Sequence, residues 1–427
     1  MPSTRLGRVA PRHASRITGS PLSIGFECLD RQMFDPERVY DRVGELGVKW
    51  ARVQTGWARC EQAEGEYDFA WLDSIVDNLL ERGVQPWFNL GYGNQVYIPD
   101  APTPDAVGWT PIFTERARTG WVNYLAALAE HFADRVKHWE VWNEANARGN
   151  FWQPKEPDAE DYAWLVQLSA DAVRPQVPEA KMIGGVVCTG LRARTMRFIE
   201  DMLEAGVGEQ LDAVSYHPYY WNPDDGDATY FEALRDLVQR YNPRLELWQG
   251  ESGGNNQPGQ RGAMHMGPWT QTIHAKWVAR RTLVDLRNGA ALSSYFHISD
   301  FENYVLGGAE GKAARHGLLT GPDYEPTEAY FTYQCVCSLF DAETVRDRRC
   351  VVYPPGRGLG DTDVDDSRTE LEQMCLKWAG FARKGRPLWA FWMPTDLFRE
   401  DEPPTGPLVV WAPKELPLED PVLIDPL

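Results

Sequence analysis

The strongest constraint on the fold is an alternation of short apolar segments with longer amphipathic ones, repeated eight times along most of the chain. Residues 48–54, for example, predict a strand. The segment that follows, 68–83, carries Leu72, Ile75 and Leu79 at helical spacing and ends at a glycine. A regular alternation of strands and helices predicts parallel strands joined by helices on the outside of the sheet.

Eight strands and eight helices are the numbers found in a (β/α)8 barrel, or TIM barrel. The predicted strands are 23–27, 48–54, 84–90, 138–144, 182–187, 211–217, 245–252 and 292–298. The helical patterns that follow them lie at 35–47, 68–83, 121–132, 160–174, 192–205, 228–241, 270–288 and 327–340. The fold class is therefore predicted to be α/β.

The chain has 427 residues, which is enough for a barrel and a smaller domain. We expect residues 21–342 to form the barrel and residues 1–20 to be a tail or an arm under its bottom. Residues 343–427 change character, with a loop-like stretch at 356–370. They contain strand signals separated by turn residues, and we expect a small antiparallel accessory sheet there, with strands at 376–382, 387–392 and 408–411.

The charge balance excludes some classes of partner. Asp and Glu total 62 against 43 Lys and Arg, a net charge of -19, whereas nucleic acids and anionic membranes require a basic face. No apolar run is long enough to span a membrane, and residues 1–20 lack the apolar core of a signal peptide. The seven cysteines follow neither a zinc spacing nor a disulfide framework. We therefore expect a cytoplasmic protein without metal or cofactor, whose oligomeric state is not indicated.

Two glutamates mark the ends of two predicted strands. Glu144 ends the segment 138–144 and Glu251 lies near the end of 245–252. The carboxyl ends of the strands of a TIM barrel converge on one face, which carries the active site. Two carboxyl groups across a sugar-sized gap are what hydrolysis of a glycosidic bond requires, because one protonates the leaving oxygen while the other attacks or activates water. Glu144 and Glu251 are thus the predicted catalytic pair.

Further polar and aromatic residues occur on the same predicted face. The candidate substrate-binding residues are Arg52, Asn89, Asn143, His217, Tyr219 and His297, together with Trp57 and Tyr92, whose rings could stack on sugars. Alternatives remain open: Arg52 could pair with a carboxylate at the edge of the core, and His217 could be an ordinary buried histidine. Glu27 could bind a sugar hydroxyl or form an ion pair, and Glu140 is expected nearer the bottom or the core.

These motifs resemble a known group of enzymes. They are Trp139-Glu140-Val141-Trp142-Asn143-Glu144, Tyr216-His217-Pro218-Tyr219 and Gly250-Glu251, with Arg52 on the second strand. The pattern resembles the clan A glycoside hydrolases, which carry the acid on strand four and the nucleophile on strand seven, and it looks most like family 39, the β-xylosidases and α-iduronidases. The likeness covers residues 22–340 and, more loosely, the β-rich tail.

The resemblance implies a retaining mechanism and assigns a role to each matching residue. Glu144 would be the acid/base and Glu251 the nucleophile. Arg52 would keep Glu251 ionised, and Tyr219 or Tyr216 would donate a hydrogen bond to it. Asn143 would bind the sugar 2-hydroxyl, and His217 would orient the acid or bind a hydroxyl.

One departure from the family pattern affects the sugar site. Clan members usually carry a Trp at the end of strand eight, and here Phe296 or His297 would have to replace that platform.

The sequence thus predicts a retaining glycoside hydrolase that cleaves an O-glycosidic bond, β-linked, in an oligosaccharide. The alternative is a carbohydrate-binding barrel that has lost its chemistry. Retention of both carboxylates favours the enzyme. A metal-dependent hydrolase on the same fold would need a His-x-His pair on the first strand, and that strand has none.

Overall fold

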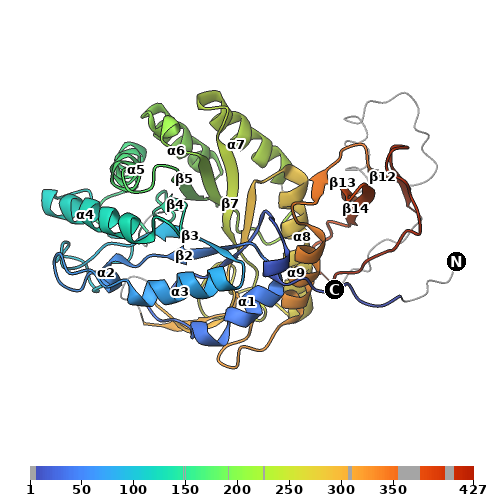
Figure 1. Ribbon diagram of the computed structural model, residues 1–427, viewed down its shortest axis with the longest axis horizontal. Coiled ribbons are helices and arrows are strands. Elements are labelled where there is room, and N and C mark those ends of the chain that lie inside the picture. The colour runs from blue at the N-terminus through green and yellow to red at the C-terminus, as the bar shows by residue number, and fades with distance from the viewer. Residues whose placement is uncertain are drawn as a thin grey trace.

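A closed barrel of eight parallel strands forms the body of the protein (Figure 1). The computed structural model describes residues 6–147, 149, 151–190, 192–224, 227–305, 310–353, 376–399 and 408–427. Neighbouring strands pair in chain order from β1 to β8. The barrel is closed by pairing of β1 with β8, in which Leu22 lies opposite Ser293. The predicted TIM barrel is therefore confirmed.

The eight barrel strands lie close to their predicted positions. They are β1 (Leu22–Gly25), β2 (Trp50–Gln54), β3 (Gln85–Leu90), β4 (His138–Val141), β5 (Lys181–Cys188), β6 (Ala213–His217), β7 (Glu246–Ser252) and β8 (Leu292–Tyr295). The fourth and eighth strands end earlier than predicted. As a result, Glu144 and His297 follow their strands instead of ending them.

The helices surround this barrel. They are α1 (Tyr40–Leu46), α2 (Trp57–Cys60), α3 (Ala70–Glu81), α4 (Glu115–Phe132), α5 (Ala159–Val173), α6 (Arg192–Glu204), α7 (Asp227–Tyr241), α8 (Gln271–Asn288) and α9 (Glu328–Leu339). Side-chain caps begin several of them. Thr114, Thr270 and Thr327 each accept a hydrogen bond from a backbone N–H in the first turn of α4, α8 and α9, which satisfies one of the donors that a helix start leaves unpaired. None of the helices in the described ranges combines the length and the apolarity needed to cross a bilayer.

Two short 3-10 helices and a hairpin were not predicted, and a third 3-10 helix lies at the start of the helical segment predicted at 35–47. The 3-10 helices are Ala14–Arg16, Pro36–Arg38 and Val207–Glu209, and the hairpin joins β9 (Phe301–Tyr304) to β10 (Lys312–Ala314) between β8 and α9. The first 3-10 helix belongs to an arm under the barrel, because Lys49 Nζ donates to the Ala14 carbonyl at 3.0 Å and Ala14 is buried.

Two small antiparallel sheets follow the barrel. One contains β11 (Thr344–Arg346), β13 (Lys377–Arg383) and β14 (Arg386–Trp392), and the other contains β12 (Val351–Tyr353) and β15 (Val409–Trp411). The first lies on the α8 and α9 side of the barrel (Figure 1). Phe381 on β13 packs edge-on against Phe340 just after α9, with ring centroids 5.0 Å apart. The predicted loop at 356–370 lies outside the described residues.

The barrel interior is divided into two layers. The lower layer is apolar and contains Trp87, Ile183, Ala213, Trp248 and Leu292, all buried, with Trp50 beside them. The upper layer, at the carboxyl ends of the strands, is charged. The Arg52 guanidinium lies over the Trp87 ring, 5.5 Å from its centroid, and marks the boundary between the two layers.

Candidate active site

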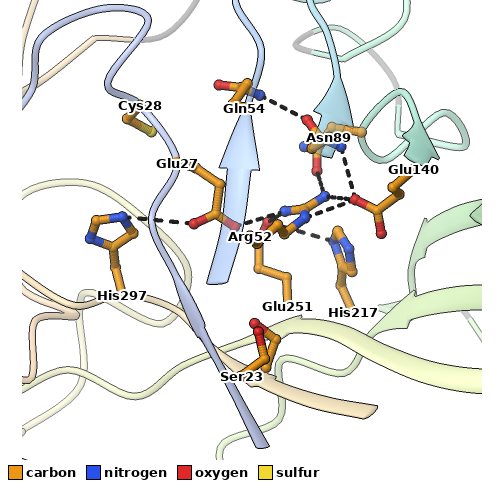
Figure 2. A network of polar contacts seen from close by, with 12 residues as sticks. Ser23, Glu27, Cys28, Arg52, Gln54, Asn89, Glu140, His217, Glu251 and His297 are labelled. Carbon is orange, nitrogen blue, oxygen red and sulfur yellow. Dashed lines mark hydrogen bonds and ion pairs between the residues drawn. The ribbon is translucent and has the colours of Figure 1, made fainter. Parts of the chain in front are cut away.

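Arg52 is the centre of the charged layer (Figure 2). Its side chain is only 1% exposed, yet it contacts three carboxylates. It donates to Glu140 Oε2 through Nε at 2.8 Å and Nη2 at 2.6 Å, and through Nη1 to Glu27 Oε1 at 3.0 Å and Glu251 Oε2 at 2.5 Å. A guanidinium suits this position because its donors lie in a fixed fork and it keeps its charge when buried.

Glu251 lies near the end of β7 and is held by two donors. Arg52 binds one carboxylate oxygen, and the Tyr219 hydroxyl donates to the other, Oε1, at 2.7 Å. Tyr219 lies two residues beyond the end of β6, the strand that pairs with β7. Hydrogen bonds from a cation and a phenol favour the ionised form of a carboxylate. Glu251 is thus oriented by a cation and a phenol and is still partly accessible, with 14% of its side chain exposed.

Glu144 approaches Glu251 from the other side of the barrel mouth. It lies three residues beyond β4, in a backbone with positive φ at both Trp142 and Glu144. Its Oε1 is 3.1 Å from His217 Nδ1, and the ligand atoms of Glu144, His217 and Glu251 all lie within 4.8 Å of one another. Burial raises the pKa of Glu144 to about 7, and Arg52 opposes this shift. Glu144 therefore holds a proton at mildly acidic pH.

The neighbouring histidine is neutral. Burial lowers the pKa of His217 to about 4, so that its ring carries no charge when it contacts the Glu144 carboxyl. A neutral imidazole and a protonated carboxyl group can form a hydrogen bond, because either group can donate the hydrogen.

Two further carboxylates complete the network. The sequence left Glu27 open between a sugar contact and an ion pair, and it placed Glu140 nearer the bottom or the core. Glu140 is fully buried and binds Arg52 through two nitrogens. Glu27 follows β1, and burial raises its pKa to about 8 while Arg52 opposes the shift. The signal available in the sequence was Glu140 itself, because a Glu inside an apolar strand requires a buried cation, and Arg52 on the second strand supplies one.

The two asparagines occupy different depths. Asn143 Oδ1 accepts from Arg52 Nη2 at 2.9 Å, which places Asn143 in the network around Arg52. Asn89 is fully buried below it. Its Nδ2 donates to Glu140 Oε2 at 2.9 Å, and its Oδ1 accepts from Gln54. Asn89 thus orients Glu140 within the network.

The three other predicted residues, Trp57, Tyr92 and His297, are buried. Trp57 is fully buried in the core, stacked between Tyr97 and Tyr124. A sugar cannot reach its ring. The expectation that Trp57 lines the site is therefore wrong, because α2 turns the side chain into the core. Tyr92 is 3% exposed and packs edge-on against Trp142.

His297 is also fully buried. Its Nε2 lies 3.7 Å from Glu27 Oε2, on the side of Glu27 away from Arg52 (Figure 2). It therefore contacts Glu27 instead of presenting its ring to a substrate.

Glu144, His217 and Glu251 are also the one group among the described residues that could surround a metal ion. Glu251 is already paired with Arg52, and a cation there would lie next to that guanidinium. The donor set therefore fits a carboxyl group next to a histidine and a carboxylate oriented by Arg52 better than a metal centre, and we assign no metal to it.

Comparisons with known proteins agree with this geometry. The model of "Glycosyl hydrolases family 39" matches residues 51–242. Over this segment the chain is similar to the family 39 glycoside hydrolases of clan A. The predicted family resemblance is thus confirmed, and the matched segment includes Arg52, Asn143, Glu144 and His217.

Individual relatives are distant. A β-xylosidase of Geobacillus stearothermophilus is 29% identical over 161 residues, which are 36% of this chain and 31% of the relative. A β-xylosidase of Caldicellulosiruptor saccharolyticus is 26% identical over 288 residues, or 60% of this chain and 55% of the relative. The family 39-like chain therefore spans about a third to about half the length of these curated relatives.

The fold extends further than the sequence likeness. A family 39 glycoside hydrolase from Bacteroides cellulosilyticus WH2 superposes with a TM-score of 0.62 at 20% identity, covering 87% of this chain and 70% of that one. A monomeric β-xylosidase from Caulobacter crescentus CB15 gives 0.57 at 20% identity, covering 81% and 77%. At this identity the likeness establishes the barrel fold.

Proposed function

We propose that this chain is a retaining glycoside hydrolase that acts on β-linked sugars through Glu144 and Glu251. The observation that carries the proposal is the pair itself. One carboxyl oxygen of each lies within 4.8 Å of the other. Glu144 has a pKa raised to about 7, and Glu251 is held by Arg52 and Tyr219. Retaining enzymes have carboxyl groups about 5–5.5 Å apart, whereas inverting ones leave room for a water, at about 6.5–9.5 Å.

The first step forms a covalent intermediate. A Glu251 oxygen attacks the anomeric carbon as the bond from that carbon to the leaving oxygen breaks, and Glu144 transfers its proton to that oxygen. In the second step Glu144, now ionised, takes a proton from a water whose oxygen attacks the anomeric carbon, and the bond to Glu251 breaks. Asn143, whose side-chain oxygen is used by Arg52, would turn its amide N–H groups towards the 2-hydroxyl.

The substrate class follows from the names of the relatives. Those reported above are β-xylosidases, and a "Beta-glucosidase 1B" of Phanerodontia chrysosporium is 30% identical over 110 residues. β-D-xylosides and β-D-glucosides are therefore the first substrates to test, as oligosaccharides or aryl glycosides. A cytoplasmic location stays a prediction from the sequence.

The test is a screen of 4-nitrophenyl glycosides followed by trapping. We expect hydrolysis of a β-xyloside or a β-glucoside. NMR should show that the β-anomer of the released sugar is formed first. A 2-deoxy-2-fluoro sugar with a good leaving group should label Glu251, as identified by peptide mass spectrometry. Initial release of the α-anomer, or stable labelling of another carboxylate, would refute the mechanism. Sugar binding without any turnover would favour the alternative of a non-catalytic carbohydrate-binding barrel.

A further inference from the structure

Glu27 and Glu251 share one nitrogen of the same guanidinium (Figure 2). Arg52 Nη1 donates to Glu27 Oε1 at 3.0 Å and to Glu251 Oε2 at 2.5 Å, whereas its Nε and Nη2 both bind Glu140. Glu27 follows β1 and Glu251 lies near the end of β7, so the barrel brings them to Arg52 from different strands. Because they share a donor atom, the charge of one carboxyl group affects the protonation of the other.

The cluster contains more acid than base. Among the described residues, Arg52 is the one guanidinium or ammonium group that pairs with Glu27, Glu140 and Glu251. If all three carboxyl groups were ionised, two negative charges would be left without a cation. The side chains of Arg52, Glu27 and Glu140 are at most 4% exposed, so water does not compensate for this excess. A proton bound by one carboxyl group lowers the cost of burying the cluster.

Glu27 is the carboxyl group whose surroundings most favour a bound proton. Glu140 accepts two hydrogen bonds from Arg52 and one from Asn89, and Glu251 accepts from Arg52 and Tyr219. Glu27 accepts from a single side-chain donor, and its Oε2 is buried without a hydrogen bond to any residue in the described ranges. Burial, together with the charge of Glu251, raises the pKa of Glu27 to about 8, and Arg52 opposes this shift.

The other ionisable groups around Glu27 do not alter this balance. His297, which follows β8, approaches Glu27 Oε2 at 3.7 Å, and burial lowers its pKa to about 3, so that its ring is neutral. The Cys28 thiol is also neutral, because burial raises its pKa. Asp30 and Arg31 follow along the chain, and their charges oppose each other in an ion pair at 3.2 Å. The proton on Glu27 therefore responds mainly to the guanidinium and to the proposed nucleophile.

The proposed reaction changes the charge of that nucleophile. When a Glu251 oxygen bonds to the anomeric carbon, the bond from that carbon to the leaving oxygen breaks and the carboxylate becomes an uncharged ester. Arg52 Nη1 then loses an anionic acceptor, and the like charge that favours a proton on Glu27 disappears. Ionised Glu27 would restore an anion at the same nitrogen.

We propose that Glu27 exchanges charge with Glu251: it binds a proton while Glu251 is a free carboxylate and releases that proton to solvent when Glu251 becomes the glycosyl ester. Hydrolysis of the ester restores the charge of Glu251, and Glu27 binds a proton again. This exchange rests on the proposed function and adds a positioning residue to it. Glu27 acts through Arg52, which it keeps paired with an anion while the net charge of the cluster stays constant.

The test counts the protons that are released as Glu251 is glycosylated. Glu144→Gln is mixed with 2,4-dinitrophenyl 2-deoxy-2-fluoro-β-D-xyloside, or with the glucoside if that sugar is the one hydrolysed. The solution is weakly buffered below the pKa of Glu27, which is raised to about 8, and contains a pH indicator dye. Dinitrophenolate leaves without a proton, and the glutamine at position 144 cannot ionise, so neither contributes to the count. We expect close to one proton for each dinitrophenolate released.

Two double variants provide the comparison. Addition of Glu27→Gln to Glu144→Gln should abolish the proton release while dinitrophenolate is still formed. Addition of Glu61→Gln should leave the release unchanged, because Glu61 is equally buried but binds Trp57 and Tyr97 outside the cluster. Formation of dinitrophenolate by Glu144→Gln with no proton released overturns the exchange. Equal release with and without Glu27→Gln overturns it as well.

A titration without turnover separates the exchange from the proposed function. In protein labelled with carbon-13 at the glutamate carboxyl carbons, the NMR signal that is missing from Glu27→Gln belongs to Glu27, and we expect it to report the raised pKa of about 8. In Glu251→Gln, which lacks the charge of the native residue, the midpoint of this signal should fall by about one pH unit or more. An unchanged midpoint overturns the exchange.

The two measurements fail in different ways. If the native chain hydrolyses no glycoside but the midpoint falls in Glu251→Gln, the proposed function fails and the coupling of Glu27 to Glu251 stands. If the 2-fluoro sugar labels Glu251 and no proton is released, the proposed function stands and the exchange fails.

Discussion

The two layers inside the barrel are built from the same strands with opposite chemistry. On β7, Trp248 lies in the apolar layer, while Glu251, three residues later, lies in the charged one. On β3, Trp87 and Asn89 differ in the same way over two residues. The lower layer buries aromatic and aliphatic surface, which stabilises the fold. The upper layer buries an arginine and three carboxylates, which costs desolvation free energy that their mutual contacts only partly offset.

This difference separates stability from function along each strand. TIM barrels place catalytic groups at the carboxyl ends of the strands, whereas the opposite end contributes to stability. Substitutions in the upper layer should therefore affect turnover, and those in the lower layer should affect unfolding. The predictions below test that separation, from the largest expected effect to the smallest.

The largest effect is expected for Glu251→Ala. Loss of the nucleophile should lower kcat on the best aryl glycoside by roughly 10⁴-fold or more, because no covalent intermediate can form. The thermal midpoint should change little, since Arg52 keeps Glu140 and Glu27 as partners. The control is Glu246→Ala at the exposed, lower end of the same strand, which should keep full activity. Turnover of Glu251→Ala near the native value would contradict the assignment.

Glu144→Gln should cost about 10²–10⁴-fold on substrates with poor leaving groups, because these need the proton most. Substrates with a dinitrophenyl leaving group should be affected much less in the first step. The pH profile gives a second measurement. Because the pKa of Glu144 is raised to about 7 and the reaction needs its proton, native kcat/KM should fall above about pH 7. Persistence of that alkaline limb in Glu144→Gln would assign it to another group.

Trp248→Ala tests the lower layer. Trp248 is 5% exposed and packs edge-on against Trp87 at 5.5 Å, so its truncation leaves a cavity. We expect the free energy of unfolding to fall by about 3–5 kcal/mol, measured by urea titration. The kcat of the remaining folded protein should stay close to native. A large loss of kcat with unchanged stability would show that the two layers are not separable.

The smallest effect concerns Glu27 and pH. Its pKa is raised from 4.5 to about 8 in the folded protein, so between these values the folded state binds a proton that the unfolded state lacks. The free energy of unfolding should therefore decrease through this group as pH rises towards about 8.

Glu27→Gln removes that titration, so its stability should vary less with pH than that of the native protein. The comparison is best made above about pH 7, where ordinary histidines are neutral in the unfolded chain and the pKa of His217 is already lowered to about 4 in the folded one. If the free energy of unfolding varies with pH in the same way in both proteins, the pKa of Glu27 is not raised as described.

The sequence was sufficient for the barrel because the information is local. Hydrophobic periodicity and turn residues give each strand and helix, and their strict alternation leaves few topologies. The predicted strands 48–54 and 245–252 agree with β2 and β7 to within two residues. The proximity of Glu144 and Glu251 was predicted for a related reason, since the topology alone brings them to the same face.

Other side chains were decided by packing that no local pattern reports. Trp57 follows β2 on the catalytic side, yet the short helix α2 turns it into the core against Tyr97 and Tyr124. Asn89 faces the buried carboxylate of Glu140, which needs polar partners away from water, and His297 lies buried 3.7 Å from Glu27.

What the sequence determined by itself is the order of the strands, the barrel that they close, and the face on which two acids meet. Only the tertiary structure decided that one arginine would join Glu27, Glu140 and Glu251, and that Phe398 from the far end of the chain would support Trp221. The physical reason is that strand periodicity is a property of neighbours in the chain, whereas charge pairing and ring packing depend on residues that approach each other only after the barrel has closed.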